Sequence, residues 1–246
     1  MSAPWPIVML GIPVGLVLGS FAVTAAMRYE TGGNAWSGGS RCDSCAAPLG
    51  LALTVPVVSF VRLGGRCSMC RAPISRWHPF GEVAGATVVT SALLVEPTWR
   101  GGVIALLGLL LLAAASVDLM TLRLPNAMTL AVGVVCAALA AAKGVGALAI
   151  GIAASGLTMA LLAAVRSFSR TREGGAGLGV GDIKLMGALA LWLGPTTPWS
   201  LTLAAVAGLF SARWAARSDG RIPFGPFIAS ASLIVGWCVE IGATHG

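Results

Sequence analysis

The chain has 246 residues, of which 57% are hydrophobic and only 10% are charged, and its mean hydropathy is +0.87. A soluble globular domain carries about 25% charged residues, so this composition excludes an ordinary water-soluble protein and indicates a membrane protein. The formal net charge of +7 does not indicate a nucleic-acid partner, because the basic residues gather between the apolar runs.

Eight apolar runs are candidates for membrane-spanning helices. The runs are continuously apolar, whereas the strands of a membrane β-barrel alternate apolar and polar residues over about 10 positions. The predicted fold class is therefore all-α: a polytopic helical membrane protein with about eight transmembrane helices. The sixth run is short for a span, but omitting it would break the charge pattern of the loops. The runs are Ile7–Met27, Phe80–Val95, Gly102–Val117, Ala127–Ala142, Gly146–Val165, Ile183–Leu193, Trp199–Trp214 and Phe224–Ile241.

The basic residues fix the orientation of these spans. With the N-terminus outside, fourteen Lys and Arg residues lie in the inside loops and only Arg100 and Lys143 lie outside. This asymmetry follows the positive-inside rule, and the inside charges also attract anionic membrane lipid. The first run precedes Arg28 and follows no basic residue, so we expect a retained helix rather than a signal peptide. The inside residues are Arg28, Arg41, Arg62, Arg66, Arg71, Arg76, Arg123, Arg166, Arg170, Arg172, Lys184, Arg213, Arg217 and Arg221.

The sequence divides into three parts. Residues 1–27 form the first transmembrane helix, residues 28–79 form a polar cytoplasmic loop, and residues 80–246 form a seven-helix membrane domain.

The cytoplasmic loop contains two Cys-x-x-Cys pairs, Cys42 with Cys45 and Cys67 with Cys70, separated by 21 residues. Two such pairs supply the four thiolates of a tetrahedral zinc site. The alternatives are disulfides, which a cytoplasmic location disfavours, or unrelated free thiols. A closed four-sulfur site leaves no position for a substrate, so the predicted zinc is structural and supplies much of the folding free energy of the loop.

Two aspartates lie where apolar runs meet polar segments. Asp118 ends the third run, and Asp182 opens the sixth after the glycine-rich segment Gly174–Gly181. A carboxylate at the centre of a bilayer helix costs roughly 2.5–3.5 kcal/mol on insertion scales, so such residues are rare and usually functional. Close together and partly desolvated, two carboxylates share a proton and act as general acid and general base, which is the chemistry of an aspartyl protease.

Structural roles are the alternative for these carboxylates. Each aspartate could cap a helix or pair with a basic neighbour, which is Arg123 for Asp118 and Lys184 for Asp182. Glu82, at the cytoplasmic start of the second run, either binds a ligand or neutralises Arg76. From the residues alone, we favour neutralisation for Glu82.

In this order, the elements resemble one family, the type IV prepilin peptidases, which are the leader peptidases of type IV pili and type II secretion. The resemblance runs through nearly the whole chain. The Gly-x-Gly-Asp element alone would be a weak signal, but the ordered set is highly specific. The matching segments are Gly19-Ser20-Phe21, the paired cysteines, Ala72–Pro79 with Glu82, Asp118 with Leu124-Pro125-Asn126, Gly177–Met186 and Ile222–Phe227.

The resemblance implies a multi-pass enzyme of the bacterial inner membrane with its active site facing the cytoplasm. Asp118 and Asp182 would be the catalytic pair, and Gly179, Gly181 and Lys184 would form the active-site or substrate-binding segment. The substrates would be prepilins and pseudopilins, cut on the cytoplasmic side of their hydrophobic segment. Cleavage would need no metal, because the aspartates supply the acid and base.

Family members usually also methylate the new N-terminal amine with S-adenosylmethionine, and Glu82 is the residue we associate with that activity. Two departures from the family pattern leave methyl transfer open. Val23 stands where the family commonly has Asn, and Leu53-Thr54-Val55-Pro56 stands where the family often has Asp-Asn before Ile-Pro.

Two other functions fit parts of the sequence. A membrane transporter or channel could use the aspartate pair as an ion site, although transporters place such groups near the membrane midplane, often on repeated broken helices. A zinc-bearing assembly factor could bind pilins without cutting them, although the intact aspartates argue against it. The sequence does not determine the oligomeric state or which prepilins are cut.

Overall fold

The computed structural model describes residues 5–33, 39–173, 178–215 and 222–245. Every regular element within these ranges is helical, in agreement with the all-α prediction. Arg217, Arg221 and positions 174–177 of the glycine-rich segment lie outside the described residues. The elements are α1 (Trp5–Glu30), the 3-10 turn η1 (Leu51–Leu53), α2 (Val58–Arg62), α3 (Trp77–Val95), α4 (Trp99–Thr121), α5 (Asn126–Ala142), α6 (Val145–Glu173), α7 (Val180–Leu193), the 3-10 turn η2 (Gly194–Thr196), α8 (Thr197–Ala215) and α9 (Gly225–His245).

Each predicted apolar run falls on one helix, and the short α2 is an additional helix in the polar loop. Among the described residues, four helices are long and apolar enough to cross a membrane, namely α1, α4, α6 and α9. The helix α5 is apolar but shorter. These lengths and compositions support a helical membrane protein.

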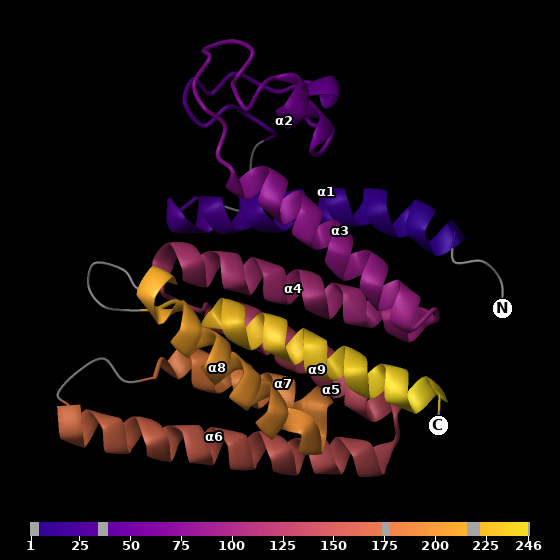
Figure 1. The fold of residues 1–246 in the computed structure, drawn as a ribbon, viewed down its shortest axis with the longest axis vertical. Helices are drawn as coiled ribbons and strands as arrows, with labels where there is room; N and C mark the ends of the chain where they lie inside the picture. The colour runs from indigo at the N-terminus through magenta and orange to yellow at the C-terminus, as the bar shows by residue number, and fades with distance from the viewer. Residues whose placement is uncertain (1–4, 34–38, 174–177, 216–221, 246) are drawn as a thin grey trace.

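Consecutive helices of the bundle run in alternating directions, so that α4 ends where α7 and α9 begin (Figure 1). Short connections produce this arrangement. Between α4 and α5, Leu122 adopts the left-handed conformation with φ 53°, and Pro125 lies in extended conformation directly before α5. Proline fits this position because it cannot continue the preceding helix and its fixed φ suits the start of the next.

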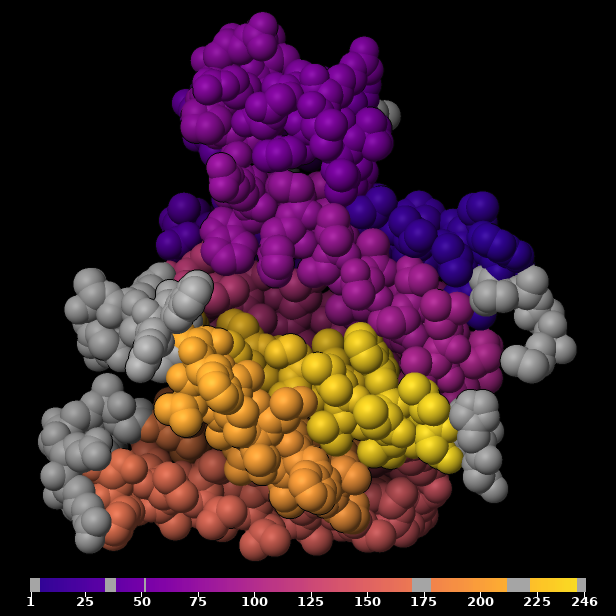
Figure 2. Space-filling model, in the orientation of Figure 1, coloured from indigo at the N-terminus to yellow at the C-terminus, as the bar shows by residue number. Residues whose placement is uncertain are grey.

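The cysteine-containing loop stands on the side of α1 that faces away from α4 (Figure 1), and its surface is distinct from the helical block in the space-filling view (Figure 2). The core of that block lies between α4, α5, α7 and α9. Leu107, Val132, Met186 and Ile228 contribute one side chain from each of these helices, and each is fully buried. Close packing of this kind, rather than exclusion of water, holds helices together where the solvent is lipid.

The closest helix contact joins α1 to α3 through glycines. Gly15 and Gly19 of α1 face Gly81 and Gly85 of α3, and a Cβ added to Gly85 would lie 2.5 Å from the Cα of Gly19. Small residues spaced four apart allow two helix backbones to approach this closely. The contact positions Glu82, which lies between the two α3 glycines.

We expect Gly85→Ala to destabilise the protein, because the added methyl group must push α1 and α3 apart. Overpacking of this kind costs typically about 1–3 kcal/mol. Gly156→Ala is the matched control, since Gly156 is also helical but has nothing within 4 Å of its would-be Cβ. The measurement is the melting temperature of each variant in detergent. A Gly85→Ala protein that melts no lower than Gly156→Ala would contradict the packing argument.

Candidate active site and metal centre

Asp118 lies in the last turn of α4 and is 5% exposed. Its Oδ2 accepts a 2.8 Å hydrogen bond from the backbone N–H of Gly225, the first residue of α9. A Cβ at position 225 would lie 2.8 Å from the same oxygen, so glycine is required for this approach. The positive end of the α9 dipole is therefore directed at the carboxylate.

Asp182 lies in the first turn of α7 and is half-buried. Its carboxylate folds back over the N-cap residue Gly179 and forms a hydrogen bond with its backbone. A Cβ at Gly179 would lie 2.7 Å from Oδ2 of Asp182. The geometry resembles a capping box, in which the third helical residue reaches back to the N-cap N–H. Asp182 therefore caps α7, which is one of the two structural roles that the sequence suggested. The other role, an ion pair with Lys184, is not formed among the described residues.

The structure brings the two aspartate segments together. The Asp118 carboxylate is near enough to act electrostatically on Asp182. Next to them, a Cβ at Gly181 would lie 2.9 Å from the Cβ of Leu124, so the segment after Asp118 packs on the Gly-x-Gly-Asp element. The two carboxylates thus lie at the same end of one helix bundle, and one of them is buried. Acid–base catalysis by a shared proton requires such an arrangement.

Lys184 links the same two segments. Its Nζ donates a 2.9 Å hydrogen bond to Oδ1 of Asn126, the first residue of α5. The two residues are 58 positions apart in the sequence, and the fold brings them together. Lys184 therefore positions α7 against α5 instead of neutralising Asp182.

The four cysteines of the loop form one cluster, with the sulfur atoms of Cys42, Cys45, Cys67 and Cys70 all within 4.8 Å of one another. The sulfur atoms of Cys42 and Cys70 are 3.8 Å apart. Zinc–sulfur bonds of about 2.3 Å place the sulfurs of a regular tetrahedron about 3.8 Å apart, so the donor set fits a Zn²⁺ ion. Backbone N–H groups of Cys70 and Met69 lower the pKa of the Cys67 thiol to about 6, which favours the thiolate that a metal binds.

The two cysteine pairs are copies of one turn. Cys42 N–H bonds to Ala47 O, and Cys67 N–H bonds to Ala72 O. Each turn ends in a left-handed residue, Ala46 with φ 55° and Arg71 with φ 60°. The sequence carries the signal for this repeat in the pattern Arg-Cys-x-x-Cys-x-Ala-Pro, which occurs at residues 41–48 and 66–73. Two equivalent turns facing each other present their sulfurs symmetrically to one metal.

Glu82 does not neutralise Arg76, and this prediction is wrong. No ion pair joins them among the described residues. Glu82 is 7% exposed, and its carboxylate accepts hydrogen bonds of 2.9 Å from Ser20 Oγ and 2.6 Å from the backbone N–H of Val57. Val57 has φ 59°, which is unfavourable for a β-branched residue, so the backbone is strained at the position that donates this hydrogen bond.

A cavity of about 800 Å³ lies between the end of α1 and the cysteine loop. Ligand pockets typically measure about 300–1,000 Å³, so this cavity is large enough for a nucleoside-sized molecule. Its lining includes Ser20, Glu82, Arg28 and His78, and His78 Nε2 lies 3.8 Å from Oδ2 of Asp43. The cavity lies by Glu82 and the cysteines, and neither aspartate of the pair lines it.

Two contacts, one at the cavity and one at Asp118, could not be predicted from the sequence. In the sequence, Ser20 stands out only as part of the Gly-Ser-Phe motif, and its hydrogen bond to Glu82 spans 62 positions. Gly225 likewise stands out only within the closing Pro-Phe-Gly-Pro segment, and its hydrogen bond to Asp118 spans 107 positions. The two motifs are the sequence signal for these contacts, because each contains a polar residue or a glycine that a purely apolar membrane span does not require.

Two family models match the chain. The bacterial peptidase A24 N-terminal domain matches residues 14–95, and the type IV leader peptidase family matches residues 105–212. The first covers most of α1, the cysteine loop and α3, and the second covers both aspartates. The chain belongs to the type IV leader peptidase family.

Curated relatives agree with this family. The chain is 34% identical over 203 residues to the prepilin leader peptidase/N-methyltransferase of Burkholderia pseudomallei, covering 78% of this chain and 64% of that protein. It is 32% identical over 208 residues to the protein of the same name from Aeromonas hydrophila, covering 80% and 69%. The type 4 prepilin-like proteins leader peptide-processing enzyme of Escherichia coli O78:H11 is 30% identical over 200 residues, covering 79% and 73%. No solved structure matches the chain.

The chain thus spans a little under two thirds of the Burkholderia relative's length. The paired cysteines lie within the first family model's match, and both aspartates lie within the second.

Proposed function

We propose that this protein is a membrane aspartyl endopeptidase that removes the leader peptide of type IV prepilins and pseudopilins at the cytoplasmic face of the bacterial inner membrane. One observation carries the proposal: the Asp118 segment and the Gly-x-Gly-Asp182 segment meet at one end of the bundle, in a chain of the type IV leader peptidase family. The relatives named as prepilin leader peptidases support the substrate class.

Hydrolysis would use the two carboxylates as a pair. The ionised member accepts a proton from a water molecule as that water attacks the scissile carbonyl carbon. The protonated member donates a hydrogen bond to the carbonyl oxygen and then supplies a proton to the leaving amine. The pair titrates as a unit, so the two roles belong to the pair. Gly179 and Gly181 would serve as active-site backbone, because the absence of side chains lets the Asp182 carboxylate and Leu124 approach that backbone closely.

The proposed topology has eight spans with the N-terminus outside. Residues 1–27 are the first span, 28–79 the cytoplasmic loop and 80–246 the seven-helix domain. Arg100 and Lys143, the two basic residues predicted outside, both contact Glu240 at the end of the bundle opposite Asp118, which supports this orientation. The placement of both aspartates at helix ends favours a peptidase over a transporter or channel, whose ion site would lie at mid-depth.

Zinc would be held by Cys42, Cys45, Cys67 and Cys70 and would have a structural role. A four-thiolate site leaves no open position, so the ion supplies folding free energy to the loop and no catalysis.

Methyl transfer to the new N-terminus is the second part of the proposal. The 800 Å³ cavity would hold S-adenosylmethionine beside Glu82. The two departures from the family pattern differ in place. Val23 is fully buried against Gly81 and is absent from the cavity lining, whereas Leu53 and Thr54 are part of that lining. The hydroxyl of Ser20 and the carboxylate of Glu82 remain in the lining.

Mass spectrometry of a type IV prepilin co-expressed with the protein tests both activities at once. We expect the product to lack its leader and to carry one added methyl group. Membranes that contain the folded protein and leave the prepilin intact would refute the peptidase proposal.

We expect Glu82→Gln to separate the two activities. The Gln amide can still accept from the Val57 N–H with its oxygen and donate to Ser20 Oγ with its nitrogen, so the variant keeps these contacts and removes the negative charge from the cavity wall. Cleavage should continue because Glu82 does not reach the aspartates, while methylation of the product should fall at least about tenfold. A variant that methylates at the wild-type rate would exclude Glu82 from this site.

A further inference from the structure

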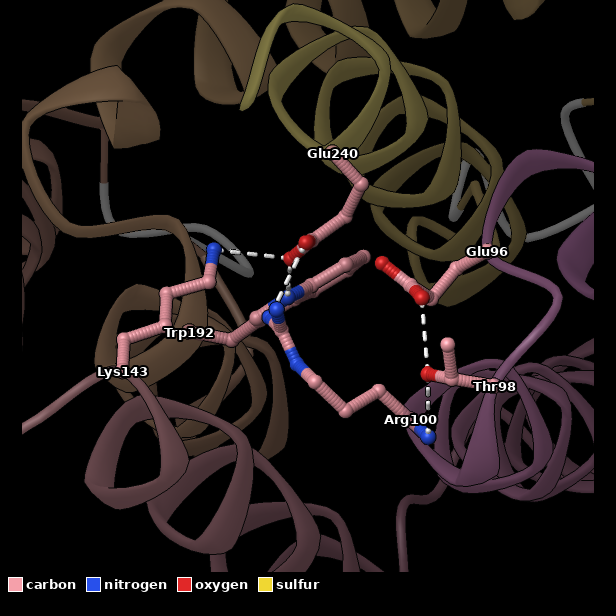
Figure 3. A network of polar contacts seen from close by, with 6 residues as sticks. All are labelled: Glu96, Thr98, Arg100, Lys143, Trp192 and Glu240. Carbon is pink, nitrogen blue, oxygen red and sulfur yellow. Dashed lines mark hydrogen bonds and ion pairs between the residues drawn. The ribbon is translucent and has the colours of Figure 1, made fainter. Parts of the chain in front are cut away.

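A network of polar side chains surrounds the buried carboxylate of Glu240 (Figure 3). It lies at the end of the helices opposite Asp118 and Asp182. At its centre is Glu240 of α9, which is 0% exposed. Its carboxylate accepts hydrogen bonds of 3.0 Å from Arg100 Nη2, 3.1 Å from Trp192 Nε1 and 2.7 Å from Lys143 Nζ. None of these residues touches the catalytic pair, and the proposed chemistry does not use them.

The network joins the same four helices that build the aspartate site. Each of these helices carries a network residue at one end and a site residue at the other. The pairs are Arg100 and Asp118 in α4, Lys143 at the C-cap and Asn126 at the start of α5, Trp192 and Asp182 in α7, and Glu240 and Gly225 in α9.

The contacts around Glu240 restrict how these helices can slide or rotate. The Trp192 ring lies against α9 so closely that a Cβ at Gly236 would be 2.5 Å from its Cζ2 atom. At the start of α4, Thr98 Oγ1 accepts a hydrogen bond from the Arg100 N–H and donates one to Glu96. A change in register of α7 or α4 would therefore leave a buried charge or indole N–H without its partner, which is costly in a low-dielectric interior.

An apolar cluster at this place would pack at least as stably as buried ion pairs. The ion pairs differ from an apolar cluster in that they permit only one relative arrangement of the helices, because each donor must face its acceptor. Helices are stiff over this length, so a register fixed at one end is carried to the other, about 27 Å away at 1.5 Å per residue over 18 residues of α4.

We propose that Glu240 is a positioning residue: through Arg100 and Trp192 it fixes the register of α4, α7 and α9, and so the approach of Asp118 to Asp182. The inference rests on the proposed peptidase function for its effect on rate. It does not rest on that function for its effect on geometry, which can be measured separately.

The test compares Trp192→Phe and Glu240→Gln with Ser232→Ala in purified protein. Trp192→Phe removes the indole N–H but keeps an aromatic ring, so we expect it to fold. It therefore keeps the test valid if Glu240→Gln does not fold. Ser232 is the matched control, because its Oγ forms an equally buried 2.8 Å hydrogen bond with Ser200 between α9 and α8, a helix that carries no site residue.

Two readouts are taken on each protein. One is kcat and KM for prepilin cleavage. The other is the rate of disulfide formation in the same variants carrying Leu124→Cys and Gly181→Cys, whose Cβ positions are 2.9 Å apart. A disulfide needs a Cβ separation of about 3.5–4.5 Å, so a small adjustment suffices and a register change of α7 slows the reaction.

We expect Trp192→Phe and Glu240→Gln to lower kcat by about 10- to 100-fold with KM changed less than about twofold, since a 1 Å misplacement can cost about 100-fold. The disulfide should also form several-fold more slowly, and Ser232→Ala should change neither readout. If the network variants match Ser232→Ala in both readouts, the inference is wrong. If the wild type cleaves nothing but its disulfide rate still depends on Trp192 and Glu240, the peptidase proposal fails and the positioning role stands.

Discussion

Asp118→Asn and Asp182→Asn are each expected to abolish leader removal while the protein stays folded and inserted. Asparagine has the same shape as aspartate and still accepts the hydrogen bond that Gly225 donates to position 118. It can neither take up a proton from water nor share one with the second aspartate. Loss of one acid–base group typically costs about 10²–10⁴-fold in rate, and the shared proton makes the upper part of that range the expected result.

The control for this experiment is Ser116→Ala. Ser116 lies two positions before Asp118 in α4 and is 2% exposed, and among the described residues its Oγ donates a hydrogen bond only to the carbonyl of Leu112 in its own helix. We expect this variant to cleave prepilin at close to the wild-type rate. The assay is the fraction of prepilin processed over time in purified membranes, normalised to the amount of folded enzyme. Near wild-type processing by either aspartate variant would refute the aspartyl mechanism.

Removal of the metal is the second large expected effect. The purified protein should contain one zinc ion per chain, and Cys67→Ser should reduce this content to near zero. Structural zinc contributes an apparent binding free energy of about 10–16 kcal/mol in small domains, and the loop has few apolar contacts to replace it. Residues 39–76 should therefore lose their fold and become sensitive to limited proteolysis.

Because the loop forms one wall of the cavity beside Glu82, the Cys67→Ser protein should also lose methyl transfer. Cleavage should be reduced far less, since the aspartates lie outside that cavity. Cys238→Ser is the control: Cys238 is exposed in α9 and is not part of the cluster. Metal content by atomic spectroscopy, with proteolysis of the loop, checks the prediction. A metal-free loop that remains protease-resistant would contradict it.

The wrong prediction for Glu82 shows a limit of reading neighbours along the sequence. Arg76 is the nearest basic residue along the sequence, but it is the N-cap of α3, and six positions at 100° per residue place the two side chains about 120° apart around the helix. Glu82 instead faces α1. Lys184 fails as a partner of Asp182 for the same reason, since residues two apart do not share a helix face.

The helices, the cysteine cluster and the helix ends that carry the two aspartates could all be predicted from the sequence. These features are local: a lipid environment demands long apolar segments, and a zinc turn needs two sulfurs at fixed spacing. The tertiary structure alone decided which groups meet, such as Gly225 with Asp118 over 107 positions and Glu240 with Arg100 over 140. Such contacts depend on how each helix is rotated and shifted against its neighbours, and nearly uniform apolar runs contain little information on either.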